Sequence, residues 1–100
     1  MLINITKETL SDKKITIIGL KKSGYAAALL GHELGANIFV SDIDNDSDII
    51  TKKNALIKKG ISVEIGNHSN LIYDADFWVI SPGVPNDIEI IKQAIKLNIP

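Results

Sequence analysis

A pair of glycines around two lysines forms the first group of residues in this sequence that could bind a ligand. The segment Gly19-Leu20-Lys21-Lys22-Ser23-Gly24 resembles the dinucleotide-binding motif GxGxxG, with Lys21 in place of the middle glycine. That glycine lets a pyrophosphate approach the backbone, so a lysine there disfavours the usual NAD or FAD pose. A helix that starts near Ser23 still offers free backbone N–H groups and a positive dipole end. The segment predicts a phosphate or carboxylate site, although a tight strand-to-helix turn with two solvated lysines is an equally good interpretation.

Asp42 is a second residue whose position indicates contact with a nucleotide. It follows Gly19 at close to the spacing of about 20 residues at which an acidic residue ends the second strand of a nucleotide-binding unit and hydrogen-bonds a ribose or base. The later aspartates of this loop are interpreted as solvated carboxylates, one of which caps the next helix; they are Asp44, Asp46 and Asp48. We therefore expect the nucleotide contact at Asp42.

The same loop matches the start of a calcium-binding EF-hand, in the pattern Asp42-x-Asp44-x-Asp46. The later positions do not match, because Ser47 stands where the loop needs glycine and Lys53 stands where it needs glutamate. The sequence therefore predicts no calcium site here.

Residue types that often carry catalysis are present but isolated. His32 and His68 have no second histidine or carboxylate at ligand spacing, so we expect a packing or capping role for each. Phe77 and Trp78 fall within an apolar run and are expected in the core or on a sheet face. The sequence contains no nucleophile elbow, Walker A lysine or cysteine. It predicts neither a catalytic residue nor a metal site.

Short apolar runs alternate with amphipathic segments along the chain, and this alternation predicts the elements that position the candidate residues. Strands are expected at 15–19, 37–41, 61–65 and 76–81. Helices are expected from Ser23 to Leu34, from the acidic loop to Lys59, and from the capping box Asn86/Glu89 toward Pro100. Their predicted buried stripes are Ala26, Leu29, Leu30 and Leu34, then Ile49, Leu56 and Ile57, then Ile88, Ile91, Ala94 and Ile95.

Strands that alternate with helices predict a parallel sheet, because parallel neighbours need crossovers and right-handed crossovers cover the sheet faces. The fold class is therefore α/β, a Rossmann-like three-layer domain with a parallel sheet of about four strands flanked by helices. Such sheets bind ligands at the carboxyl ends of their strands. Three segments meet that condition: Gly19–Gly24, Ser41–Asp44 and Ser81–Pro85.

Length and composition bound the possible functions. The chain has 100 residues, is 45% hydrophobic and carries a formal net charge of -1. This is one ordinary globular domain with no global positive field for nucleic acid or anionic lipid. Neither a signal peptide nor a membrane-spanning run is visible, so we expect a cytoplasmic protein. The pattern predicts a further strand where the sequence stops, which indicates a domain cut from a longer protein.

Three stretches of the sequence carry a resemblance to a known family. They are ITIIGLKKSGYAAALLGHELGANIFVSD, KKGISVEIGNHS and DADFWVISPGVPNDIEIIKQAIKLNIP, and they fall between residues 13 and 100. The strand that runs into SPGVP is the most specific of these features. Together they resemble the N-terminal domain of the Mur ligases, in the MurD branch that joins D-glutamate to UDP-N-acetylmuramoyl-L-alanine.

The resemblance implies a role and a set of site residues. In that family a three-domain enzyme activates the substrate carboxylate as an acyl phosphate with ATP and magnesium, and D-glutamate then attacks. Residues 1–100 would be the single domain that grips the UDP part of the substrate, without catalytic residues, metal or cofactor of its own, in a monomeric enzyme whose central ATPase and C-terminal domains lie elsewhere. By position, the ligand contacts would be Lys22 and Ser23 at the helix start, Asp42 and Ile43 beside the uracil, and Ser81, Pro82 and Gly83 near the diphosphate.

The sequence departs from the family at two places. Lys21 replaces the glycine usual in the turn, and Ile43 with Asp44 replaces a polar and often basic pair, which puts side-chain contacts to the uracil in doubt. Two alternatives stay open: a Rossmann module that binds NAD or another adenine nucleotide for regulation or redox chemistry, and a non-binding fragment whose crevice needs the missing domains.

Overall fold

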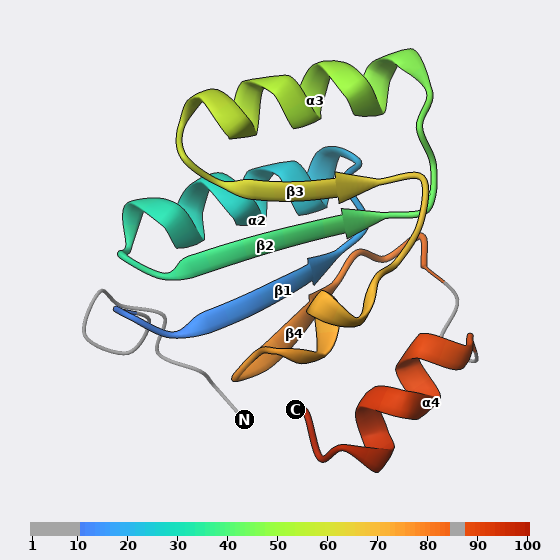
Figure 1. Ribbon diagram of the computed structural model, residues 1–100. Coiled ribbons are helices and arrows are strands. Elements are labelled where there is room, and N and C mark those ends of the chain that lie inside the picture. The colour runs from blue at the N-terminus through green and yellow to red at the C-terminus, as the bar shows by residue number, and fades with distance from the viewer. Residues whose placement is uncertain (1–10, 85–87) are drawn as a thin grey trace.

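The computed structural model describes residues 11–84 and 88–100, which form a four-stranded parallel sheet with helices on both faces (Figure 1). The sheet order is β3-β2-β1-β4. The elements, in chain order, are β1 (Lys14–Ile18), α2 (Lys22–Glu33), β2 (Asn37–Asp42), α3 (Ser47–Lys58), β3 (Ser62–Ile65), the short 3-10 helix η1 (Asn70–Tyr73), β4 (Phe77–Ile80) and α4 (Glu89–Lys96). The predicted α/β Rossmann-like class is confirmed, and each predicted strand is present with its ends within one residue of the prediction.

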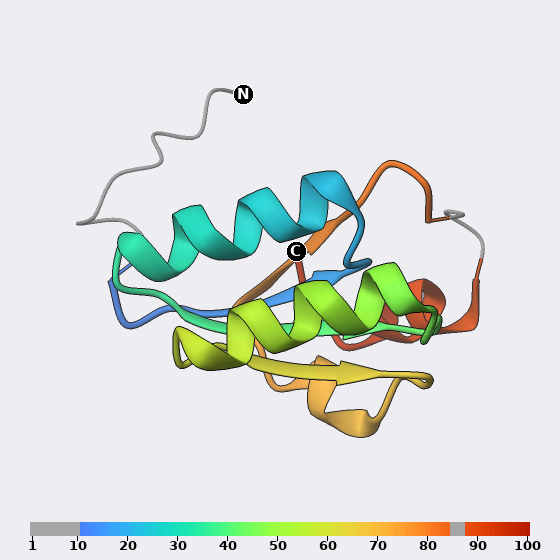
Figure 2. The ribbon, with the colours of Figure 1, turned by 90° about the horizontal axis from the view of Figure 1, so that it is seen from above.

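The central strand β1 shows why the domain has three layers. It pairs with β2 on one side and β4 on the other, so both of its edges are hydrogen-bonded within the sheet and its side chains point to the two faces. Ile15 and Ile17 pack with α2 and α3 in one core cluster, while Ile18 points into a second cluster with Trp78 and Ile91. Alternate residues of a strand face opposite sides of a sheet, which produces these two cores. Figure 2 shows α2 and α3 lying side by side over one face of the sheet.

The buried face of α2 differs from the predicted stripe. Gly24, Ala28 and Gly31 are the buried residues of the helix, whereas Ala26 and Leu30 are exposed. Small residues let the helix backbone lie close to the sheet, and this contact outweighs the burial of the larger Leu30. The prediction is therefore wrong for Ala26 and Leu30, whereas Leu29 and Leu34 are partly buried against the core as predicted, and the helix itself is correct.

Two further apolar residues are predicted to be buried and are found exposed. Ile57 in α3 and Ile95 in α4 are exposed, while their stripe neighbours Ile49, Leu56, Ile91 and Ala94 are buried. Each helix therefore buries a narrower stripe than the spacing predicts.

The helix caps agree in part with the sequence. Asp46 caps α3 by accepting a hydrogen bond from Ile49 N at 3.0 Å, which confirms that a loop aspartate has this role. Ile88 occupies the N-cap of α4 and makes no side-chain cap bond. The predicted cap at Asn86 lies outside the described residues.

The two aromatic residues of β4 lie in the core, as predicted: Phe77 packs against the first cluster and Trp78 belongs to the second. The Trp78 ring lies 5.8 Å from the ring of Tyr73, and its Nε1 donates to Ile72 O at 2.8 Å. The Trp78 backbone N–H donates to Pro100 O at 3.0 Å, so the end of the sequence lies beside β4 (Figure 1). Among the described elements, no helix combines the length and hydrophobicity needed to cross a bilayer.

Candidate functional site

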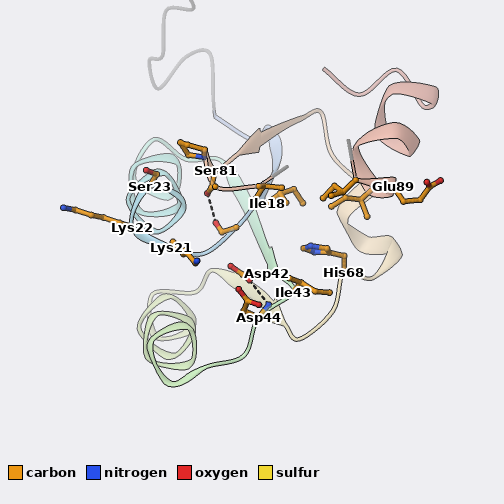
Figure 3. Close-up of a pocket in the computed structure, with 16 residues that line it drawn as sticks. Ile18, Lys21, Lys22, Ser23, Asp42, Ile43, Asp44, His68, Ser81 and Glu89 are labelled. Carbon is orange, nitrogen blue, oxygen red and sulfur yellow. Dashed lines mark hydrogen bonds between the residues drawn. The ribbon is translucent and has the colours of Figure 1, made fainter. Parts of the chain in front are cut away.

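A cleft of about 660 Å³ opens at the carboxyl ends of β1, β2 and β4 (Figure 3). The chain reverses its direction across the sheet here, since it passes from β1 outward to β3 and then returns to β4 on the other side. This is where open parallel sheets bind their ligands. All seven residues selected from the sequence line this one cleft: Lys22, Ser23, Asp42, Ile43, Ser81, Pro82 and Gly83.

The turn after β1 is hydrogen-bonded to the last residues of β2 and to the first residue after β4. Gly19 has a φ of +101°, and a Cβ there would lie 2.9 Å from the Cβ of Ser81, so only glycine fits. Gly19 N donates to Ser41 O at 2.9 Å, and Ser81 Oγ donates to Gly19 O at 3.1 Å. The Ser81 hydroxyl has a single proton, and it donates that proton to Gly19 O. The side chain can therefore only accept hydrogen bonds from a ligand.

The buried Asp42 carboxylate accepts hydrogen bonds from two backbone N–H groups. Its Oδ2 accepts from Leu20 N at 2.6 Å, and its Oδ1 accepts from Asp44 N at 2.8 Å. The residue is only 5% exposed. The carboxylate therefore connects the turn after β1 to the loop after β2, and any contact with a ribose or base comes in addition to this structural role.

The first turn of α2 faces the cleft with unpaired backbone donors. Lys21 is the N-cap residue and makes no side-chain cap bond, and the first helical bond runs from Tyr25 N to Lys21 O at 2.9 Å. The N–H groups of the first helical residues thus have no partner within the helix. Figure 3 shows the Lys22 side chain pointing away from the cleft. A ligand would therefore meet the backbone of Lys22 and Ser23 together with the positive end of the helix.

A second polar network, centred on Ser41, lies under the cleft. Ser41 is fully buried, and its Oγ lies 2.6 Å from Glu64 Oε2 and 2.7 Å from His68 Nδ1. Glu64 Oε2 also accepts from Ser69 N at 2.8 Å. Burial of the Glu64 carboxyl opposes its charge, but the hydrogen bonds from Ser41 and Ser69 and the nearby His68 outweigh burial and lower the pKa of Glu64.

This network makes Glu64 a source of stability that depends on pH. A carboxyl whose pKa is lowered by folding stabilises the fold above its unfolded pKa, and this contribution is lost as the pH falls through the folded pKa. We expect Glu64→Gln to unfold at lower urea concentration than the wild type at pH 7, with the difference shrinking below about pH 4. Glu33→Gln, at the exposed end of α2, is the matched control and should leave the urea midpoint unchanged. A Glu64→Gln difference that stays constant with pH would contradict the network.

His68 is the site residue that the sequence interpretation missed. It lines the cleft and bonds to Ser41, so it belongs with the residues of the cleft, where the sequence predicts no more than a packing or capping role. His32 is exposed in the last turn of α2, which excludes packing in the core and agrees in position with the capping alternative. A usable signal existed, since His68 follows the third predicted strand at the same edge of the sheet as the other candidates. Within residues 11–84 and 88–100, no group of three or more histidine or acidic side chains forms a metal site.

The family model described as the MurD N-terminal domain matches residues 14–90. The chain belongs to the MurD N-terminal domain family. UDP-N-acetylmuramoylalanine--D-glutamate ligase from Chloroherpeton thalassium is 41% identical over 96 residues, which cover 96% of this chain and 20% of the relative. The ligase of the same name from Acidobacterium capsulatum is 42% identical over 92 residues, which cover 91% of this chain and 20% of the relative. The chain thus spans about one fifth of the length of these relatives.

Solved structures of proteins with other names have a similar backbone. The precorrin-2 dehydrogenase SirC superposes with a TM-score of 0.61 at 14% identity, covering 96% of this chain and 44% of its own. The bacillithiol disulfide reductase Bdr from Bacillus cereus superposes with a TM-score of 0.51 at 26% identity, covering 63% of this chain and 22% of its own. The SirC likeness supports the fold of this MurD N-terminal domain and nothing more specific.

Proposed function

We propose that this MurD N-terminal domain binds the UDP part of UDP-N-acetylmuramoyl-L-alanine for a ligase of peptidoglycan precursor synthesis in the cytoplasm. The observation that carries the proposal is the meeting of three separate loops, selected from the sequence, around one cleft of about 660 Å³. That volume suits a nucleoside diphosphate with part of its sugar. The family membership supplies the substrate class.

The diphosphate fits best between the start of α2 and the loop after β4. Backbone N–H groups at Lys22 and Ser23 and the helix dipole favour an anion there. The Gly83 position leaves room, since a Cβ added to it would meet nothing within 4 Å. The uracil then lies toward Asp42 and Ile43, where Ile43 is 59% exposed and offers an apolar surface to the base.

The chemistry of ligation belongs to the rest of the protein in this proposal. ATP and Mg²⁺ would convert the L-alanyl carboxylate into an acyl phosphate, and the amine of D-glutamate would displace phosphate to form the amide bond, with ADP and phosphate as products. Residues 1–100 hold the nucleotide end and place no side chain in that step. We therefore expect a monomeric ligase of several domains, and no ligation by this domain alone.

NMR titration of the ¹⁵N-labelled chain tests the substrate class. With UDP-N-acetylmuramoyl-L-alanine, the amides of Ser23, Asp42 and Gly83 should shift, because all three line the cleft. The amides of His32 and Gly60, which line a shallow hollow elsewhere, should stay in place and serve as the internal control. NAD should leave both sets unchanged, since Lys21 occupies the position where a dinucleotide needs glycine.

The alternative function, binding of NAD or another adenine nucleotide, predicts the opposite result in the same titration. An NAD- or adenine-nucleotide-binding module would show shifts at Ser23 and Asp42 with NAD and none with the uridine ligand. The absence of shifts with both ligands would contradict nucleotide binding by this domain.

A further inference from the structure

The Ser41, Glu64 and His68 side chains share their hydrogen atoms in only one consistent way. Ser41 Oγ lies 2.6 Å from Glu64 Oε2, 2.7 Å from His68 Nδ1 and 3.4 Å from Asn67 O, and the hydroxyl has one proton for these three neighbours. The Glu64 carboxylate can only accept, so the Ser41 proton must lie between Ser41 and Glu64. Otherwise two acceptors would face each other at 2.6 Å without a hydrogen. His68 must then donate its Nδ1–H to Ser41.

This assignment decides what His68 presents to the cleft. With the proton on Nδ1, the neutral ring carries a lone pair on Nε2. Nε2 has no partner within the described part of the chain, and Figure 3 shows the ring pointing into the cleft, toward Ile18 and Ile43. The network thus offers a hydrogen-bond acceptor to whatever occupies that side of the cleft.

An acceptor at this place suits a nucleoside and not a phosphate. Phosphate oxygens are themselves acceptors, and the donors that suit them lie at the start of α2, across the cleft from His68 (Figure 3). Asp42 and Asp44 line the cleft next to the loop that carries His68, since Gly66 N donates to the backbone oxygens of both, and their carboxyl groups also disfavour an anion there. A uracil imide N–H and ribose hydroxyls are the donors that a uridine nucleotide carries.

We propose that His68 Nε2 accepts a hydrogen bond from the nucleoside of the bound ligand, with Ser41 and Glu64 as positioning residues that hold the ring in the Nδ1–H form. The inference rests on the proposed function, because it assumes that a uridine nucleotide occupies the cleft. It adds a specificity-determining residue on the loop after β3.

The first test needs no ligand. Long-range ¹H–¹⁵N spectra distinguish the two neutral forms of a histidine ring, and above neutral pH His68 should show the Nδ1–H form. Exposed imidazole favours Nε2–H, so His32 should show that form and serve as the control. Ser41→Ala should move His68 toward the Nε2–H form while the amide spectrum stays folded. A His68 ring in the Nε2–H form in the wild-type chain would overturn the assignment.

The second test measures affinity for UDP by the same NMR titration. His68→Phe should weaken UDP binding about five- to tenfold, the effect of one neutral hydrogen bond, whereas His32→Phe should leave it unchanged. His68→Gln should recover part of the loss, because its amide oxygen reaches toward the place of Nε2. Two analogues identify the donor: N3-methyl-UDP lacks the imide N–H, and 2′-deoxy-UDP lacks the ribose 2′-hydroxyl. The analogue without the donor that His68 uses should bind wild type and His68→Phe with equal affinity.

The outcomes separate the two proposals. Wild-type UDP binding that His68→Phe leaves unchanged would overturn the role of His68 and leave the proposed function standing. A folded wild-type chain that takes up no UDP would overturn the proposed function and, with it, this inference. A loss in His68→Phe that His68→Gln does not relieve would reduce His68 to a packing residue and also overturn the inference.

Discussion

Gly24→Ala is expected to lower the free energy of unfolding by about 3 kcal/mol. A Cβ at this position would lie 1.8 Å from the backbone O of Gly19 and 2.9 Å from Ser81 Oγ. Backbone atoms cannot move aside as a side chain can, so either α2 must shift away from the sheet or the turn after β1 must change. Urea unfolding followed by circular dichroism measures the loss, and the same variant should bind UDP more weakly because both sides of the cleft move.

Gly31→Ala is the matched control, since it adds the same methyl group to the same helix. The nearest atom to its Cβ is Ile38 Cδ1 at 2.7 Å, which is the end of a flexible side chain. Alanine also gains about 1 kcal/mol of helix propensity over glycine, which offsets the crowding. We expect Gly31→Ala to stay within about 1 kcal/mol of the wild type. Equal stabilities for the two variants would contradict the close approach of α2 to the turn.

Asp42→Asn is expected to cost about 2 kcal/mol of unfolding free energy, although it changes one atom of the side chain. Both partners of the Asp42 carboxylate are backbone donors: Leu20 N at 2.6 Å and Asp44 N at 2.8 Å. An amide has one acceptor oxygen, so its NH₂ group must face one of these N–H groups. Loss of the bond to Leu20 leaves a donor unpaired in a fully buried residue.

The control for this variant is Asp44→Asn, which makes the same chemical change on an exposed residue of the same loop. Its unfolding free energy should match the wild type, because no described hydrogen bond uses the Asp44 carboxylate. The amides of Leu20 and Asp44 should move most in the spectrum of Asp42→Asn. A fully stable Asp42→Asn chain would show that the carboxylate is dispensable for the turn and acts on the ligand alone.

Much of the fold could be predicted because its signals are local. Gly35 after α2 and Asp46 before α3 mark helix ends that need only neighbouring residues to form. The apolar runs at β1 and β2 are short and bounded by polar residues, so strand positions follow directly. The faces of the helices were harder to predict: spacing placed Leu30 and Ile95 inside, while the structure leaves both exposed. Which face is buried depends on how closely a helix approaches the sheet, and that distance is a property of two elements together.

The sequence by itself determined the alternation of strands and helices, the three loops at the carboxyl ends of the strands, and the resemblance to the MurD N-terminal domain that the family model confirms. Only the tertiary structure decided that these loops enclose one cleft, that Asp42 binds Leu20, and that Ser41 joins Glu64 to His68. These bonds connect residues 22 to 27 positions apart. No local spacing encodes such pairs, because parallel pairing brings them together only after a whole helix has crossed from one strand to the next.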